Sequence, residues 1–482
     1  MPQLAMGIDH SHLIDALVAD KHDEIVAIAR ELLEQVQSPD VLLARIGMIA
    51  VHGDSDGHPS ITLAAAAMLA RLLHTIPQSI DGNSSLPERA LPLVVQALRQ
   101  AVPVVKAGYK KEPHYPQPLF PSGLPEGETV NQKMHEAVYN HDTLLTEQLL
   151  FGLYGSGADY RSMEVRTYDG ISATFQRVGH PLMFAVRGFQ LLDAVEWGDR
   201  APNILHWLAP HLPLRTDADE PSWIQAVRNF IADPAHSVAS VRTRLAAPRD
   251  ENALPLRALI TTSHADPARV CQGVYDALVT GGASPRAVGS VIALAATDII
   301  QSVDDSNREL FVRLAHGLLF SSAVRQVFRR VQDVEVLTLL FTSAAFINAL
   351  YKDTLEETKQ STQKVSRTMA ALRTGGLIAV SQLETLEAQL KAQDLTDALA
   401  TAQRYLKLAY DPHALFATIA RVSALTDARD DQGHTLQITQ AASEEFLAWP
   451  ASLASTGAEG FLHVALRAAA FGQHDPAIAK LL

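Results

Sequence analysis

Cysteine is almost absent from this chain, since Cys271 is the only one among its 482 residues. A single thiol cannot form an intrachain disulfide, and it excludes zinc ribbons and iron–sulfur clusters, which take several thiolate ligands. A chain without disulfides suits a reducing compartment. Residues 1–12 also lack the basic and apolar segments of a signal peptide, so we expect a cytoplasmic protein.

Long apolar runs and basic patches are missing as well. The longest apolar stretch, residues 334–351, contains Glu335 and Asn348 and falls short of the ~20 residues that a membrane-spanning helix needs. We therefore predict a buried core helix there and no membrane partner. The net charge of −13 repels phosphate backbones, and no basic run is long enough to bind anionic lipids, so nucleic acid is not an expected partner either.

The common cofactor and catalytic motifs are also missing. The chain has no GxxxxGK[ST] phosphate loop, no GxGxxG after a strand, no HExxH and no GxSxG. We therefore expect no nucleotide cofactor. Redox chemistry in such a chain requires a metal, a loosely held cofactor or no cofactor.

Helical periodicity, in contrast, runs through almost the whole chain. Ile25, Ala29 and Leu32 recur at the spacing of one helix face, and comparable patterns cover, among others, residues 60–73, 171–197 and 435–448. Sustained alternation, which is typical of strands, is absent. We predict an all-α fold, with one helical body over residues 1–482 and candidate sub-units 1–210, 211–375 and 376–482.

Prolines interrupt the helical pattern most strongly at residues 106–129. Five prolines in this segment prevent a regular helix. A loop of this length inside a compact protein is often functional. Its aromatic residues Tyr109, Tyr115 and Phe120 would suit a lid over an aromatic ligand, and a plain crossover between helices is the alternative.

Histidines recur at matching places in a repeated helical unit. One copy runs from His141 to His180, a second from His264 to His316, and a weaker third from His413 to His463. Repeated helices that carry histidine can build one metal site, because neutral imidazole is a common ligand of iron, zinc and copper. We predict that His141, His180, His264 and His316 point into one central cavity around which the units pack. A duplicated scaffold without a site is the alternative.

The densest polar cluster is residues 52–58, which place two imidazoles and two carboxylates on a glycine-hinged turn. His58 precedes Pro59, and proline is favourable in the first helical turn. We add His58 to the candidate metal ligands. Asp54 or Asp56 would then orient an imidazole by accepting a hydrogen bond from the ring nitrogen that does not bind the metal. His52 is a second candidate ligand in this cluster. The alternative is an Asx turn that caps the helix.

Two segments match the pattern of a known family. Residues 140–158, which begin Asn140-His141-Asp142, look like an NHxxxHxLLxLYxLGA pattern, and Gly179-His180-Pro181-Leu182 looks like the GHPLIHLG pattern that follows it. Over residues 135–195 the chain resembles the questin oxidase-like family of helical oxygenases, which cleave anthraquinone-type polyketides. The resemblance implies an all-α fold, a metal site that includes His141 and His180, an aromatic polyketide substrate and dioxygen. Phe184 stands where the family pattern has a second histidine.

We therefore expect a metal-dependent oxygenase that acts on an aromatic or polyketide-like small molecule. Fe(II) is the expected metal, because imidazole suits iron, with the ligands drawn from His58, His141, His180, His264 and His316. Two other classes stay open. His141-Asp142 resembles the HD pair of all-helical metal phosphohydrolases, and helical repeats with an acidic surface suffice for an interaction scaffold without chemistry.

Overall fold

The computed structural model describes residues 9–35, 38–77, 85–172, 174–195, 197–213, 220–248, 253–304, 307–360, 378–449 and 458–481. Helix dominates them, and the only β-type pairing among them is an isolated bridge between Thr426 and His474. The prediction of an all-α fold is confirmed. The candidate boundary after residue 375 lies outside the described residues, and the one after residue 210 falls in the last turn of a helix.

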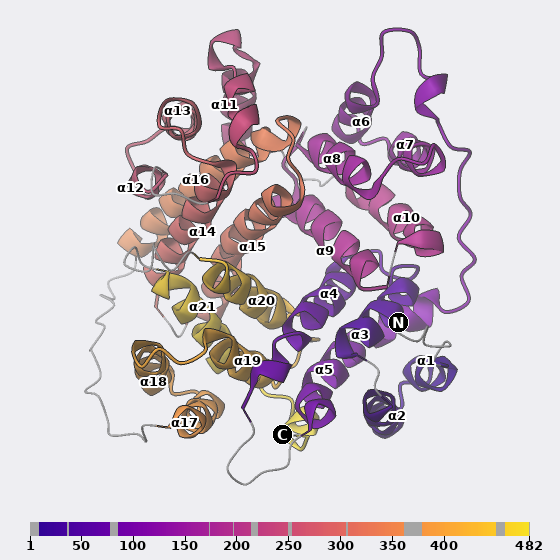
Figure 1. The fold of residues 1–482 in the computed structure, drawn as a ribbon, viewed down its shortest axis with the longest axis vertical. Coiled ribbons are helices and arrows are strands. Elements are labelled where there is room, and N and C mark those ends of the chain that lie inside the picture. The colour runs from indigo at the N-terminus through magenta and orange to yellow at the C-terminus, as the bar shows by residue number, and fades with distance from the viewer. Residues whose placement is uncertain are drawn as a thin grey trace.

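In the described part of the chain, ten α-helices precede residue 212. They are α1 (Ser11–Val18), α2 (His22–Glu34), α3 (Pro39–Ala50), α4 (His58–Ala70), α5 (Leu86–Gly108), α6 (Val130–Tyr139), α7 (Thr143–Gly155), α8 (Tyr160–Ile171), α9 (His180–Val195) and α10 (Ala201–His211). In Figure 1 these helices fill the right side of the molecule, with α1–α5 below and α6–α10 above.

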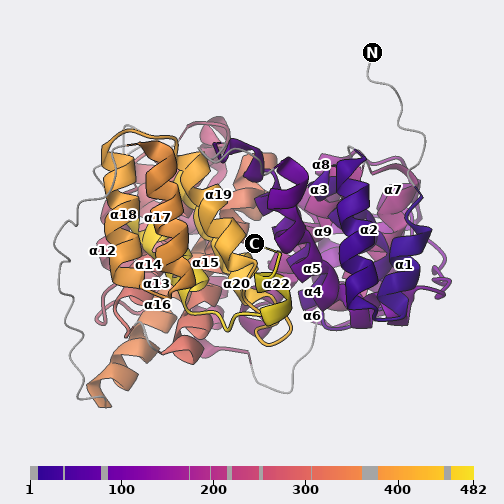
Figure 2. The ribbon, with the colours of Figure 1, turned by 90° about the horizontal axis from the view of Figure 1, so that it is seen from below.

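The remaining α-helices fill the other side of the molecule (Figure 1). They are α11 (Ser222–Ala232), α12 (Pro255–Ile260), α13 (Pro267–Tyr275), α14 (Pro285–Gln301), α15 (Arg308–Arg330), α16 (Thr338–Gln360), α17 (Ala379–Lys391), α18 (Leu395–Lys407), α19 (Pro412–Ser423), α20 (His434–Leu447), α21 (Glu459–Ala470) and α22 (Pro476–Ala479). Seen from below, α1–α5 and α17–α20 stand side by side with their axes roughly parallel (Figure 2).

Four helices form a ring at the middle of the molecule. Helix α4 packs against α9, α9 against α15, α15 against α20, and α20 against α4. Close approach to α4 is easy because it carries four consecutive buried alanines, Ala64 to Ala67, which keep its surface flat. Buried apolar side chains form one continuous core that reaches from Leu13 to Ile478, so the ring lies deep inside it.

The helix predicted over residues 171–197 is broken in the structure. Helix α8 ends at Ile171, and α9 begins at His180. Just before α9, Arg177, Val178 and Gly179 have φ values of 44°, 49° and 85°. Because three consecutive residues in the left-handed region cannot continue a right-handed helix, the chain turns here and starts a new one. Periodicity alone did not reveal this turn.

The proline-rich segment is a loop, as predicted, with one short 3₁₀ turn at Pro121–Gly123. The loop lies on α7 and α10, as a crossover between helices does, and the lid interpretation stays a prediction. Its Leu119 amide donates to the carbonyl of Gln148 at 2.9 Å, and the Tyr115 hydroxyl bonds to Asn203 at 3.2 Å. Residues 334–351 form a 3₁₀ turn followed by most of α16, whose first half is buried, in agreement with the predicted core helix.

Candidate metal centre

Four histidines meet where the four ring helices converge. His58 comes from α4, His180 from α9, His316 from α15 and His434 from α20. Neighbouring ring centroids lie 4.8 Å apart for His58 and His180, 5.2 Å for His180 and His316, 4.9 Å for His316 and His434, and 5.2 Å for His434 and His58. We call this set the histidine quartet. Three members, His58, His180 and His434, have ligand atoms that all lie within 4.8 Å of one another.

Three of these histidines begin their helices, and each follows a glycine in the left-handed region. Gly57, Gly179 and Gly433 have φ values of 97°, 85° and 75°. A Cβ on Gly57 would lie 2.4 Å from the Phe184 ring, and one on Gly433 would lie 2.0 Å from Thr62 Oγ1. Both the backbone conformation and the lack of space therefore require glycine. The Gly-His turns fix where each imidazole enters the centre.

Every imidazole of the quartet has its Nδ1 hydrogen-bonded to an oxygen acceptor. The Nδ1 of His58 donates to Asp56 Oδ2 at 2.6 Å, and that of His180 donates to the Arg177 carbonyl. The Nδ1 of His316 donates to the Val312 carbonyl at 2.9 Å, and that of His434 to the Asp431 carbonyl at 2.5 Å. Since carbonyl and ionised carboxylate oxygens only accept, all four Nδ1 atoms carry the proton.

When the rings are neutral, the four Nε2 atoms consequently carry no proton, and their lone pairs face the centre. The Nε2 atoms of His58 and His180 lie 3.0 Å apart, and those of His316 and His434 lie 3.2 Å apart. Burial is the main cause that lowers the pKa of His316 and of His434 to about 4 each, so at neutral pH no proton bridges that pair. Facing lone pairs repel each other unless a cation lies between them.

Within each of the two pairs, the spacing of the nitrogens suits coordination of one transition-metal ion. Metal–imidazole bonds are about 2.0–2.1 Å long, so two nitrogens bound at right angles to one ion lie about 3.0 Å apart. The observed separations of 3.0 and 3.2 Å agree with this geometry. His58, His180 and His434 are 4%, 5% and 6% exposed, so water is largely kept from this side of the centre. The residues present fit a metal ion with imidazole ligands.

Aspartates hold the two Gly-His turns on α4 and α20. Asp54 accepts from the Gly57 amide at 2.7 Å and from the Ser60 amide at 2.9 Å, while Asp431 accepts from the Gly433 and Thr435 amides at 2.9 Å each. These bonds fix the start of each helix. Asp54 therefore acts as the predicted cap.

Asp56, one of the two aspartates predicted for this role, orients an imidazole. The hydrogen bond from His58 is the main cause that lowers the pKa of Asp56, so its carboxylate stays ionised. Its other oxygen lies 3.1 Å from Arg177. Pairs of this kind, a carboxylate behind an imidazole ligand, raise ligand basicity and fix ring orientation in metal sites.

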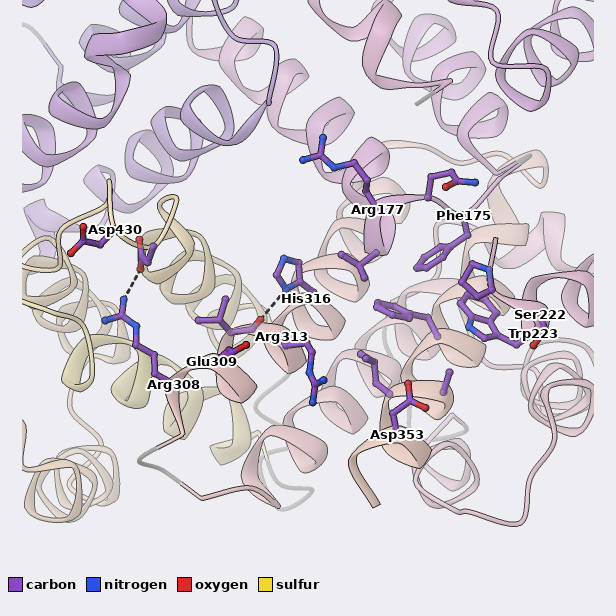
Figure 3. A pocket seen from close by; sticks show the side chains of 18 residues that line it. Phe175, Arg177, Ser222, Trp223, Arg308, Glu309, Arg313, His316, Asp353 and Asp430 are labelled. Carbon is purple, nitrogen blue, oxygen red and sulfur yellow. Dashed lines mark hydrogen bonds and ion pairs between the residues drawn. The ribbon is translucent and has the colours of Figure 1, made fainter. Parts of the chain in front are cut away.

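A pocket of about 1180 Å³ opens beside the quartet and is lined by His316. Phe175, Trp223 and Phe346 form an aromatic wall, with ring centroids 4.8–6.2 Å apart. Figure 3 shows His316 projecting from α15 into this space, with Phe175 and Trp223 across from it. Charged side chains surround the apolar interior: Arg177, Arg308, Glu309, Arg313, Asp353, Asp430 and Asp431. An apolar pocket with a few polar groups beside a candidate metal centre is typical of a small-molecule site.

Three of the five predicted ligands, His58, His180 and His316, meet in the quartet. The other two do not, so the predicted convergence is wrong for them. His141 lies in the turn before α7 and its Nδ1 bonds to the Pro213 carbonyl at 2.9 Å. His264 is exposed in the turn before α13. In both repeats this first histidine precedes an aspartate that caps the next helix, so what recurs there is a capping turn.

His434 was missed, because it lies inside the weaker third unit, between His413 and His463, and does not match either end of the repeat. A signal was present in the sequence, since the chain contains three Gly-His dipeptides and all three supply quartet histidines. Asp430-Asp431-Gln432-Gly433-His434 also parallels the turn before His58 in having acidic residues just ahead of Gly-His. His52, in contrast, lies outside the quartet, and burial is the main cause that lowers its pKa.

None of the helices in the described part of the chain combines the length and the apolarity needed to cross a membrane. Comparisons with protein-family models, curated proteins and solved structures each found no match. The resemblance of residues 135–195 to the questin oxidase-like family therefore stays a prediction, and the site is supported by its geometry.

Proposed function

We propose that this protein is a metal-dependent oxygenase in which the histidine quartet holds a non-haem iron ion and the adjacent pocket holds an aromatic small molecule. The observation that carries the proposal is the convergence of imidazole Nε2 lone pairs whose Nδ1 atoms are all hydrogen-bonded to acceptors. Lone pairs held close together in this way repel each other and destabilise the folded protein. A bound cation removes that repulsion.

Neutral imidazoles leave the charge of a bound ion uncompensated except through Asp56 behind His58. An iron(II) ion held in this way would supply dioxygen activation and would attract an anionic oxygen of the substrate, such as a phenolate. A reaction that places both atoms of dioxygen in the product consumes no external reductant. This agrees with the lack of nucleotide-binding motifs in the chain.

The chain's own residues would bind the substrate and exclude water. Phe175, Trp223 and Phe346 offer flat apolar surfaces for an aromatic ring. Phe184 is fully buried behind the centre, with its ring centroid 5.5 Å from that of His180 and 6.2 Å from that of His58. A dry apolar backing of this kind protects reactive species from water.

The two other classes receive less support. Phosphoryl transfer by paired Mg²⁺ or Mn²⁺ ions prefers carboxylate ligands, whereas the candidate ligands here are imidazoles. The HD pair is engaged elsewhere, because Asp142 caps α7 through the Leu145 amide and His141 bonds to Pro213. A scaffold without chemistry needs no converging imidazoles in its interior.

The proposal is tested by metal analysis of the purified protein together with oxygen consumption. We expect about one iron per chain after loading with Fe(II) under anaerobic conditions, and oxygen uptake that requires both the iron and an added hydroxylated anthraquinone or catechol. Replacing His180 by Ala should abolish both, whereas the exposed His264→Ala should change neither. Full oxygen uptake by a metal-free protein would contradict the proposal, and so would a wild-type chain that binds no iron, zinc or cobalt.

A further inference from the structure

The four quartet histidines are not equivalent. His58, His180 and His434 each stand at the first position of a helix on a Gly-His turn, and each is at most 6% exposed. His316 lies within α15, eight residues after its start, and is only partly buried. It alone among the quartet lines the pocket.

We propose that His58, His180 and His434 are permanent ligands and that His316 is a replaceable fourth ligand, whose place on the ion is taken by an oxygen of the substrate. This inference rests on the proposed function, since it assumes a metal ion at the quartet. Three imidazoles suffice to hold an ion, and catalytic metal sites need a position that substrate or dioxygen can occupy.

The positions of the helices favour exchange at His316. The left-handed glycines and their close contacts fix where α4 and α20 begin, so His58 and His434 sit at rigid points of the fold. The His316 ring borders the pocket, so a substrate bound in the pocket reaches its side of the centre first. Rotation of this side chain toward the pocket would release Nε2 without moving α15.

The exchange is a simple ligand substitution at the ion. The bond from the ion to His316 Nε2 breaks, and a bond from the ion to an ionised substrate oxygen forms. The number of bonds to the ion and its oxidation state are unchanged. His316 is thereby left beside the bound substrate with a free lone pair.

The experiment uses the full chain loaded with Co(II), whose visible spectrum reports the ligand set, and 4-nitrocatechol as the aromatic probe. Single alanine variants of His58, His180 and His434 should lose Co(II) affinity by more than about 100-fold, while His316→Ala should lose less than about tenfold. His316→Gln serves as a second variant that keeps more of the side-chain volume. His141→Ala, outside the quartet, should match the wild type.

Probe binding provides the decisive measurement. Saturation with 4-nitrocatechol should bring the wild type and His316→Ala to the same Co(II) spectrum, because His316 has left the ion in both. His316→Ala should also bind the probe more tightly, since no ligand is displaced. Loss of Co(II) by both His316 variants as severe as for His180→Ala, or different end spectra, would overturn the inference and leave the proposed function intact. A wild type that binds no metal would overturn both.

Discussion

At the scale of single residues, the centre is defined by which nitrogen of each imidazole is occupied. Acceptors behind Nδ1 direct Nε2 inward in all four rings, but only His58 has a carboxylate behind it, that of Asp56. A carboxylate polarises an imidazole more than a carbonyl does. Asp56 therefore makes His58 the most basic of the four candidate ligands.

Replacing Asp56 by Asn is expected to lower metal affinity by about 10- to 100-fold with little effect on folding. The amide keeps the shape and an acceptor oxygen but removes the negative charge. A matched control is Asp411→Asn, because Asp411 also bonds to a histidine Nδ1, that of His413, at 3.0 Å on the exposed surface. Competition with a chromophoric chelator measures both variants, and equal affinities in the two would refute a special role for Asp56.

The metal-free protein should lose stability in mild acid. Burial is the main cause that lowers the pKa of His316 and of His434 to about 4, whereas an unfolded histidine titrates near 6.5. Between these values the unfolded chain binds protons that the folded chain excludes, so stability is full above about pH 6.5 and falls as pH drops toward 4.

Urea unfolding with a chelator present, at several pH values from 7 to 4.5, measures this effect. Near pH 5 the wild type should take up about two more protons on unfolding than the double variant His316→Gln, His434→Gln. An equally steep pH dependence in that double variant would show that other groups cause it.

At the scale of elements, the Gly-His turn is the device that aims a ligand. Its glycine bends the chain, its histidine begins the helix, and an upstream aspartate caps that helix at α4 and α20. The same local sequence thus serves both folding and the placement of an imidazole.

Alanine at Gly57 or Gly433 should therefore damage the centre as well as the fold. The new Cβ would meet the Phe184 ring or Thr62 Oγ1 within 2.4 Å, in addition to a left-handed cost of about 1–2 kcal/mol. Gly157→Ala is the control, because Gly157 has a φ of 77° with nothing within 4 Å of its added Cβ. Gly157→Ala should show only the backbone cost and keep full metal binding.

Thermal unfolding and Co(II) titration of the three glycine variants separate these effects. Wild-type metal affinity in Gly57→Ala and Gly433→Ala would argue against a role of the turn in aiming the ligand.

At the scale of the whole molecule, the quartet joins two halves of the chain. Helices α4 and α9 come from the part before residue 212 and contribute His58 and His180, which are 122 residues apart. Helices α15 and α20 come from the part after residue 212 and contribute His316 and His434, which are 118 residues apart. A bound ion would therefore cross-link the two halves at their centre.

Metal binding should raise the unfolding temperature of the whole chain by a few degrees. A free metal concentration 100 times the dissociation constant adds about 2.7 kcal/mol to the folded state if the unfolded chain does not bind. Differential scanning calorimetry with and without Zn(II) or Co(II) measures the shift. His264→Ala should retain it, and His180→Ala should lose it. An unshifted wild type at saturating metal would contradict the cross-link.

The amino-acid sequence by itself determined the helical class, the buried helix in residues 334–351, the proline-rich loop and three quartet members. These follow from local physics, because periodicity, proline geometry and polar turns act over a few residues. Only the tertiary structure decided which histidines meet. His141 and His180 share a repeat and yet separate, whereas His58 and His434 lie 376 positions apart in the sequence and become neighbours, with ring centroids 5.2 Å apart. The physical reason is that convergence depends on the packing of α4 against α20, which periodicity within either helix does not encode.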